Sequence, residues 1–159
     1  MLQLFPQKKA SPLLVTDNNE ANARFSPDGN WLAYCSDESG RAEVYVQPFP
    51  LEKGGKWQVS TNGGFTPRWR KDGKELFFLS PDNQIMAAEI KLGTTFEASM
   101  PRPLFSIHPW IVPQIAGGWR DTFEPTSDGQ RFAVHTPLSS SPSNITVILN
   151  WKLLLNPNK

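Results

Sequence analysis

Residues 24–34 read Arg-Phe-Ser-Pro-Asp-Gly-Asn-Trp-Leu-Ala-Tyr, a polar turn that leads directly into an apolar run. In Pro27-Asp28-Gly29, the proline sets φ for the first central position of a turn, the aspartate tolerates the second, and the glycine takes the left-handed conformation. The apolar run continues to Cys35, which is typical of a strand buried on both faces. This stretch therefore predicts a hairpin whose second strand, residues 31–35, lies inside a core.

The hairpin is repeated along the chain. A shift of 72 − 28 = 44 residues places Asp28-Gly29 on Asp72-Gly73 without a gap, and a third copy follows at Ser127-Asp128-Gly129, after 128 − 72 = 56 residues. A period of this size, made of short strands and turns, indicates a β-propeller or a solenoid. The ungapped shift also matches Gln3 with Gln47, Phe5-Pro6 with Phe49-Pro50, Lys9 with Lys53, Val15 with Val59, Asn18 with Asn62, Arg24 with Arg68, Leu32 with Leu76 and Ser36 with Ser80.

One copy of the repeat contains four predicted strands: residues 23–25, 31–35, 42–46 and 56–60, the last alternating as a half-exposed strand does. Four antiparallel strands with the most polar one outermost describe a propeller blade. We therefore expect an all-β fold, a partial β-propeller of four-stranded antiparallel blades.

The blades are expected at residues 23–60 and 67–107, with an incomplete last blade at 121–151. Its strands are expected at 121–125, 130–135 and 145–151. Residues 1–16 are interpreted as the end of an upstream blade, with a third strand at 2–6 and a fourth strand at Ser11–Thr16.

This inventory of about three blades is short of the four to eight that usually close a ring. The missing blades are supplied either in cis, by a longer polypeptide, or in trans, by a second copy that forms a six-bladed dimer through strand exchange. The redundant third-strand stub at residues 2–6 favours the first explanation.

Composition excludes several classes of function. The net charge is +1, and Lys and Arg are spread along the chain, which argues against nucleic-acid binding. No apolar run approaches the roughly 20 residues that span a bilayer, so no membrane insertion by this segment is expected. The single cysteine, Cys35, excludes an intrachain disulfide and a cysteine-built metal site. Composition leaves the compartment open.

The run Arg24–Tyr34, followed by Val44-Tyr-Val46, resembles the Pro-Asp-Gly repeat of TolB-like β-propellers. It is also similar to the propeller blades of prolyl-oligopeptidase-type peptidases. The ending Asn144–Trp151 resembles the close of propellers that lie C-terminal to bacterial membrane-anchored Ser/Thr kinases. The resemblance implies a fold, a habit of binding partners and a periplasmic or extracytoplasmic location. The resemblance implies no catalytic activity.

The best candidate contact surface is the insertion at residues 108–120, which breaks the period and carries His108, Trp110, Trp119 and Arg120. The competing interpretation is that Trp110 packs over the blade beneath. The insertion is expected on the face opposite the Asp-Gly turns, together with the loops 37–40, 62–65, 81–83 and 136–143. His135, at the end of a predicted strand, could line the central region or serve a structural role.

No catalytic constellation emerges from the remaining residues. The repeated aspartates are interpreted as turn formers that bond their own backbone, and Cys35 as a small buried hydrophobe. There is no Gly-x-Ser-x-Gly nucleophile motif, no phosphate-binding loop and no second histidine at metal-binding spacing, so neither a cofactor nor a metal is expected.

The sequence therefore predicts a module that is not an enzyme, that binds a protein or peptide, and that is the C-terminal part of a larger protein. The alternatives are an accessory, gating or sensor domain of a larger enzyme, a Ser/Thr kinase or a prolyl-oligopeptidase-type peptidase, and a carbohydrate or small-ligand site that uses Trp119 and Arg120.

Overall fold

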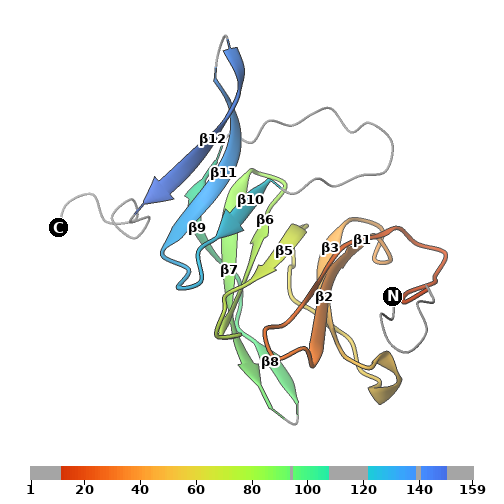
Figure 1. Cartoon of the computed structure of the whole chain (residues 1–159). Coiled ribbons are helices and arrows are strands. Elements are labelled where there is room, and N and C mark those ends of the chain that lie inside the picture. The colour runs from red at the N-terminus through yellow and green to blue at the C-terminus, as the bar shows by residue number, and fades with distance from the viewer. Residues whose placement is uncertain (1–11, 94, 108–121, 139–140, 150–159) are drawn as a thin grey trace, which may run out of the picture.

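The computed structural model describes residues 12–93, 95–107, 122–138 and 141–149, which form three antiparallel sheets lying side by side in chain order (Figure 1). The first sheet has the order β1-β2-β3-β4, and the third the order β10-β11-β12. The second has the order β5-β6-β7, with β8 and β9 both paired to β7. The expected all-β architecture of four-stranded antiparallel blades is confirmed. The strands are β1 (Glu20–Phe25), β2 (Trp31–Ser36), β3 (Glu43–Pro48), β4 (Trp57–Gln58), β5 (Phe65–Trp69), β6 (Glu75–Leu79), β7 (Gln84–Leu92), β8 (Phe96–Ala98), β9 (Arg102–Ser106), β10 (Phe123–Pro125), β11 (Arg131–Leu138) and β12 (Ser141–Leu149), and a short 3-10 helix, η1, spans Leu51–Lys53.

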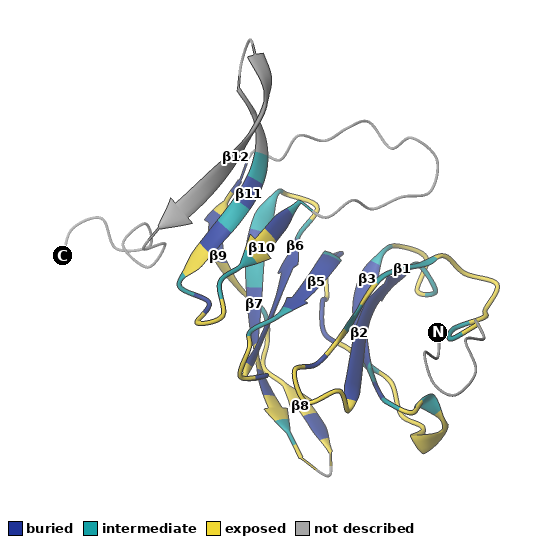
Figure 2. Ribbon diagram, in the orientation of Figure 1, coloured by how far each residue is buried: buried dark blue, intermediate teal, exposed yellow. Residues whose placement is uncertain are grey.

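Two hydrophobic cores hold the sheets together. Every residue of β2 is buried, as the apolar run predicted, and so is every residue of β6 (Figure 2). Alternate residues of these strands point to opposite faces, so Leu76 and Phe78 of β6 pack toward the first sheet while Phe77 and Leu79 pack toward the third. The second sheet is therefore the shared wall between both cores.

The aspartate of each of the three Asp-Gly turns accepts hydrogen bonds from within its own turn. In each, the aspartate carboxylate accepts the backbone N–H two residues later, at 3.1 Å for Asp28, 3.0 Å for Asp72 and 3.0 Å for Asp128. The following glycines have φ of 73°, 73° and 68°, the left-handed region that favours glycine. The interpretation of these aspartates as turn formers is confirmed.

The ungapped repeat is wrong for the third strand. Cys35 pairs with Val44 in the first sheet, whereas Leu79 pairs with Ile85 in the second, so the third strands are related by 85 − 44 = 41 residues rather than 44. The connection between the second and third strands is three residues shorter in the second sheet. An odd offset exchanges the two faces of a strand, but β7 has apolar residues on both, with Ile85 and Ala87 in one core and Ala88 and Ile90 in the other, so the sequence match concealed the offset.

The corrected register identifies equivalent outer-strand positions. Val46 of β3 pairs with Trp57 of β4, and its counterpart Ala87 of β7 pairs with Arg102 of β9. Trp57 and Arg102 therefore occupy the same place in their sheets.

Of the fourth strand expected at Ser11–Thr16, the described residues 12–16 form no ladder, and the third strand expected at residues 2–6 lies outside the described residues. None of the described strands pairs with residues 12–16. This segment is instead tied to the first sheet through Asn19, whose backbone N and Nδ2 donate to the carboxylate of Asp37 at 2.9 and 2.7 Å. Over the described residues, no helix has the length and hydrophobicity needed to cross a membrane.

Candidate functional site

The face opposite the Asp-Gly turns, here called the loop face, carries the connections 37–40, 60–64 and 81–83. Its central support is Glu43, which is 1% exposed. The Glu43 carboxylate accepts Arg41 Nε at 2.7 Å, the backbone N of Gly63 at 3.0 Å and the hydroxyl of Ser60. Ser60 Oγ in turn accepts the backbone N of Val44 at 2.7 Å. This network fixes the connection between the first two sheets.

The first strands of the sheets are bulged close to the loop face. The register of β1 slips between Ala21 and Arg24, and that of β5 slips at the equivalent place. The bulges contain Asn22 and Thr66, which have φ of 56° and 49°. Positive φ is rare for residues other than glycine and is most costly for a β-branched side chain such as Thr66.

The two bulge positions and their repeat equivalent before β10 share an unusual polar feature. Asn22, Thr66 and Thr122 are related by the repeat shifts of 66 − 22 = 44 and 122 − 66 = 56 residues. Among the described residues, Asn22 Nδ2, Thr66 Oγ1 and Thr122 Oγ1 are the buried side-chain atoms without a hydrogen-bond partner. Each sheet therefore has one buried, unsatisfied polar side-chain atom at the same repeat position, within β1 and β5 and directly before β10, a signal that composition and turn motifs do not reveal.

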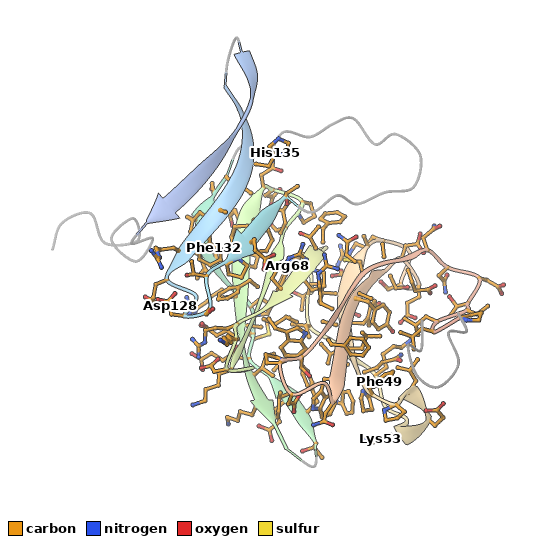
Figure 3. The ribbon with its side chains drawn as sticks, viewed as in Figure 1. Phe49, Lys53, Arg68, Asp128, Phe132 and His135 are labelled. Atoms are coloured by element: carbon orange, nitrogen blue, oxygen red, sulfur yellow. The ribbon has the colours of Figure 1, made fainter. Side chains whose placement is uncertain are left out.

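An ion pair joins the first strands of the second and third sheets. Arg68 is 4% exposed, and its Nε lies 2.7 Å from Glu124 Oε2 while its guanidinium also donates to the carbonyl of Pro67 at 2.8 Å (Figure 3). Lys71 N donates to Ser127 O at 3.3 Å between the adjoining turns. These contacts set the relative position of the two sheets along the edge formed by β5 and β10.

Of the residues singled out from the sequence, His135 lies in β11, where it is half-buried and its backbone N donates to Thr122 O at 3.0 Å (Figure 3). His108, Trp110, Trp119 and Arg120 lie outside the described residues. Within the described ranges, no three His, Cys, Asp or Glu side chains gather into a possible metal site.

Cys35 is fully buried in the first core, and its thiol donates to Gly64 O at 3.4 Å. Burial raises the pKa of the Cys35 thiol to about 12. Because the reactive species is the thiolate, this cysteine has no nucleophilic character at neutral pH. Its interpretation as a small buried hydrophobe is confirmed.

Two cavities open on the opposite face, here called the Asp-Gly face, which carries the turns 26–30, 70–74 and 126–130. One, of about 720 Å³, lies between the turn 70–74 and the β7–β8 hairpin and is lined mainly by charged residues. The other, of about 390 Å³, lies between the turn at Asp28 and the segment from Pro48 to Trp57. The sequence predicts no site on this face. The glycines Gly54 and Gly55, close before Trp57, are the sequence feature that indicates a loop packed against the tryptophan ring.

Comparison with known proteins supports the architecture alone. No family model and no curated protein matches the chain. Among solved structures, an oligogalacturonate lyase from Vibrio parahaemolyticus superimposes with a TM-score of 0.54 at 20% identity over 80% of this chain. This chain has the fold of a partial β-propeller.

The propeller chain spans only 34% of the length of that lyase. A second oligogalacturonate lyase, in complex with manganese, gives a TM-score of 0.48 at 18% identity over 69% of this chain and 26% of its own. TolB from Acinetobacter baumannii gives 0.43 at 16% identity over 87% of this chain and 43% of its own. At these identities the similarity carries no activity.

Proposed function

We propose that this chain is a non-catalytic propeller module that binds a protein or peptide through its loop face. The observation that carries the proposal is the Glu43 network, which holds the connection 60–64 against the first sheet through Arg41, Ser60 and Gly63. Preorganised loops on a rigid scaffold are the usual location of binding sites, because little conformational entropy is lost on association. The burial of Cys35 is consistent with the absence of nucleophilic chemistry from this part of the chain.

The module is proposed to be the C-terminal part of a larger protein. Cys35 and Leu79, at equivalent places in β2 and β6, are buried against the next sheet, whereas His135 at the same place in β11 is half-buried. A further sheet on that side, supplied in cis or by a second copy, would complete the burial. The same arrangement is compatible with an accessory or sensor domain of a Ser/Thr kinase or a prolyl-oligopeptidase-type peptidase.

The mass of the full chain in solution, measured by light scattering behind a sizing column, tests how the ring is completed. A uniform dimer supports completion by a second copy. A polydisperse sample supports completion by further sequence in the same polypeptide, since uncovered sheet faces and edges promote association.

Selection from a peptide-display library on the immobilised chain tests the binding role. Peptides that bind the loop face should lose affinity for Asn62→Lys and Asp82→Lys, two exposed positions in the connections of that face. Glu52→Lys, an exposed position in η1, is the matched control and should retain binding. Enriched peptides that respond equally to all three variants, or no enrichment in repeated selections, would contradict the proposal.

A further inference from the structure

The cavity of about 390 Å³ on the Asp-Gly face, here called the tryptophan cavity, is built by two sheets. The first sheet contributes the turn at Asp28 and the segment from Pro48 to Trp57, and the second contributes Leu92 and Gly93 at the end of β7. Its volume lies within the roughly 300–1,000 Å³ typical of small-molecule sites. It suits a small ligand rather than a folded partner.

The floor of the tryptophan cavity is a fixed aromatic surface. The rings of Trp31 and Trp57 meet edge to face at 5.7 Å, and both contact Phe96 of the second sheet, at 5.4 and 5.6 Å. Gly55, with φ of 88°, lies so close that a Cβ there would come within 2.6 Å of the Trp57 ring. Trp57 is thus held in one orientation while remaining only partly buried.

The rim of the cavity supplies hydrogen-bonding groups of both charges. Asp28 is oriented by the hydroxyl of Ser26 at 2.5 Å and by the backbone N and side-chain amide of Asn30, each at 3.1 Å. Those hydrogen bonds, led by the one from Ser26, hold the pKa of Asp28 below its usual range, so the group is an ionised acceptor. Across the cavity, Lys53 Nζ donates to Phe49 O at 3.1 Å and keeps two further N–H groups for other acceptors (Figure 3).

The repeat shows that this arrangement is not required by the fold. Trp31 and Glu75 are equivalent by the shift of 44 residues, and Trp57 and Arg102 are equivalent by strand pairing. The second sheet fills these positions with an ion pair, Arg102 NH2 to Glu75 Oε1 at 2.9 Å. Stacked sheets thus tolerate a polar pair at this place, and the tryptophans are a local specialisation of the first sheet.

An apolar ring surface beside a carboxylate, an amide and an ammonium group matches a ligand with one apolar face and a polar edge. A sugar ring has this form, since its C–H groups cover one face and its hydroxyls both donate and accept around the edge. Phosphate would be repelled by the ionised Asp28 carboxylate, and binding of a peptide is tested directly in the titration below. We propose that the tryptophan cavity is a saccharide-binding site in which a sugar ring packs on Trp57 and hydrogen-bonds to Asp28, Asn30 and Lys53.

The test is a titration of the ¹⁵N-labelled full chain, followed through the indole N–H resonances. The ligands are maltotriose, trigalacturonic acid, the tripeptide Gly-Tyr-Gly and inorganic phosphate. The Trp57 resonance is identified by its loss in Trp57→Phe. A saturable shift of this resonance with either saccharide supports the site, and a stronger response to trigalacturonic acid shows that Lys53 binds the acid group.

Lys53→Ala provides an independent variant, because Lys53 is exposed and its loss is not expected to affect folding. It should weaken trigalacturonic acid about tenfold, the worth of one charged hydrogen bond. Lys91→Ala, an exposed lysine in the larger cavity of the same face, is the matched control and should leave affinity unchanged. No shift of Trp57 with either saccharide, a shift with the tripeptide or phosphate alone, or equal affinity in Lys53→Ala and Lys91→Ala would overturn the proposal, whatever the outcome of the peptide selection on the loop face.

Discussion

The first and second sheets stabilise the same place in the repeat by different means. The first sheet pairs Trp31 with Trp57 at 5.7 Å, and the second pairs Glu75 with Arg102 at 2.9 Å. Glu75 also accepts Arg70 NH1 at 2.5 Å, so the carboxylate is shared by two guanidinium groups. One sheet gains from removing aromatic surface from water, and the other from charge-assisted hydrogen bonds.

This difference shows which part of the blade is constrained. The buried alternation of β2 and β6 is kept in both sheets because it forms the walls of the two cores. The outer corner admits either chemistry because it borders the cavities on the Asp-Gly face, where Trp31 and Trp57 line the smaller cavity and Glu75 lines the larger one. Stability and salt response should therefore differ between the two corners.

The largest effect is expected from Trp31→Ala, which should lower the free energy of unfolding by about 4 kcal/mol, as for other buried tryptophans. Trp31 is 7% exposed and contacts both Trp57 and Phe96, so its removal opens a void that neighbours cannot fill. Urea denaturation measures the change. Trp31→Phe retains an aromatic ring and should cost far less, and an equal cost for both variants would show that the aromatic corner does not contribute through packing.

Glu75→Gln should cost about 2 kcal/mol, since it removes charge-assisted hydrogen bonds while preserving shape. The side chain of Glu75 is 11% exposed, whereas that of Arg102 is 45% exposed. Arg102→Gln should therefore cost much less, because an exposed partner can be replaced by water. Urea denaturation at constant pH compares them. A larger loss for Arg102→Gln than for Glu75→Gln would invert our assignment of the buried carboxylate as the centre of this corner.

Local patterns were sufficient to predict the buried hairpin of each blade. The run Trp31–Cys35 predicts a strand buried on both faces, and Pro27-Asp28-Gly29 predicts the turn before it. These features depend on residues adjacent in sequence. The repeat then extended the prediction to the turns at Asp72 and Asp128.

Features that depend on pairing between distant residues were not predicted. The three-residue offset between the third strands could not be detected by sequence matching, because β7 carries apolar residues on both faces. The residue types at positions 22 and 66 do not predict the bulges that the register shows there. The Arg68–Glu124 ion pair joins residues 56 positions apart and follows from the stacking of sheets. The candidate site was placed mainly on His108, Trp110, Trp119 and Arg120, outside the described residues.

Substitutions in the two bulges should change the free energy of unfolding by smaller amounts and in opposite directions. Thr66→Asn should raise the free energy of unfolding by about 1 kcal/mol, because asparagine adopts positive φ more readily than a β-branched residue. Asn22→Thr, at the equivalent place in β1, should lower it by a similar amount. Both positions already carry an unpaired polar atom, so that cost largely cancels in the comparison. Thermal denaturation of both variants tests this, and changes of the same sign would contradict a role for backbone strain.

The smallest effect is the loss of stability at low pH, which should differ in cause between the two turns that flank the cavities. The pKa of Asp28 is lowered chiefly by the hydroxyl of Ser26, and that of Asp72 chiefly by the guanidinium of Arg70. A carboxylate with a lowered pKa stabilises the fold above its ordinary pKa, and this contribution is lost as the pH falls through the lowered value. Both turns should therefore weaken only in acid, below the ordinary range for aspartate.

Salt should distinguish the two aspartates. At about 1 M NaCl the screening length falls to about 3 Å, so the pKa of Asp72 should rise while that of Asp28, set by a neutral donor, stays nearly constant. Carboxyl ¹³C chemical shifts followed through a pH titration at low and high salt measure both values in one sample. In Arg70→Gln the pKa of Asp72 should rise toward its ordinary value and lose its salt dependence. Equal salt responses of Asp28 and Asp72 in the unsubstituted chain would mean that the overall field of the molecule sets both pKa values. The contrast between the aromatic corner of the first sheet and the ion-paired corner of the second would then not extend to the turns.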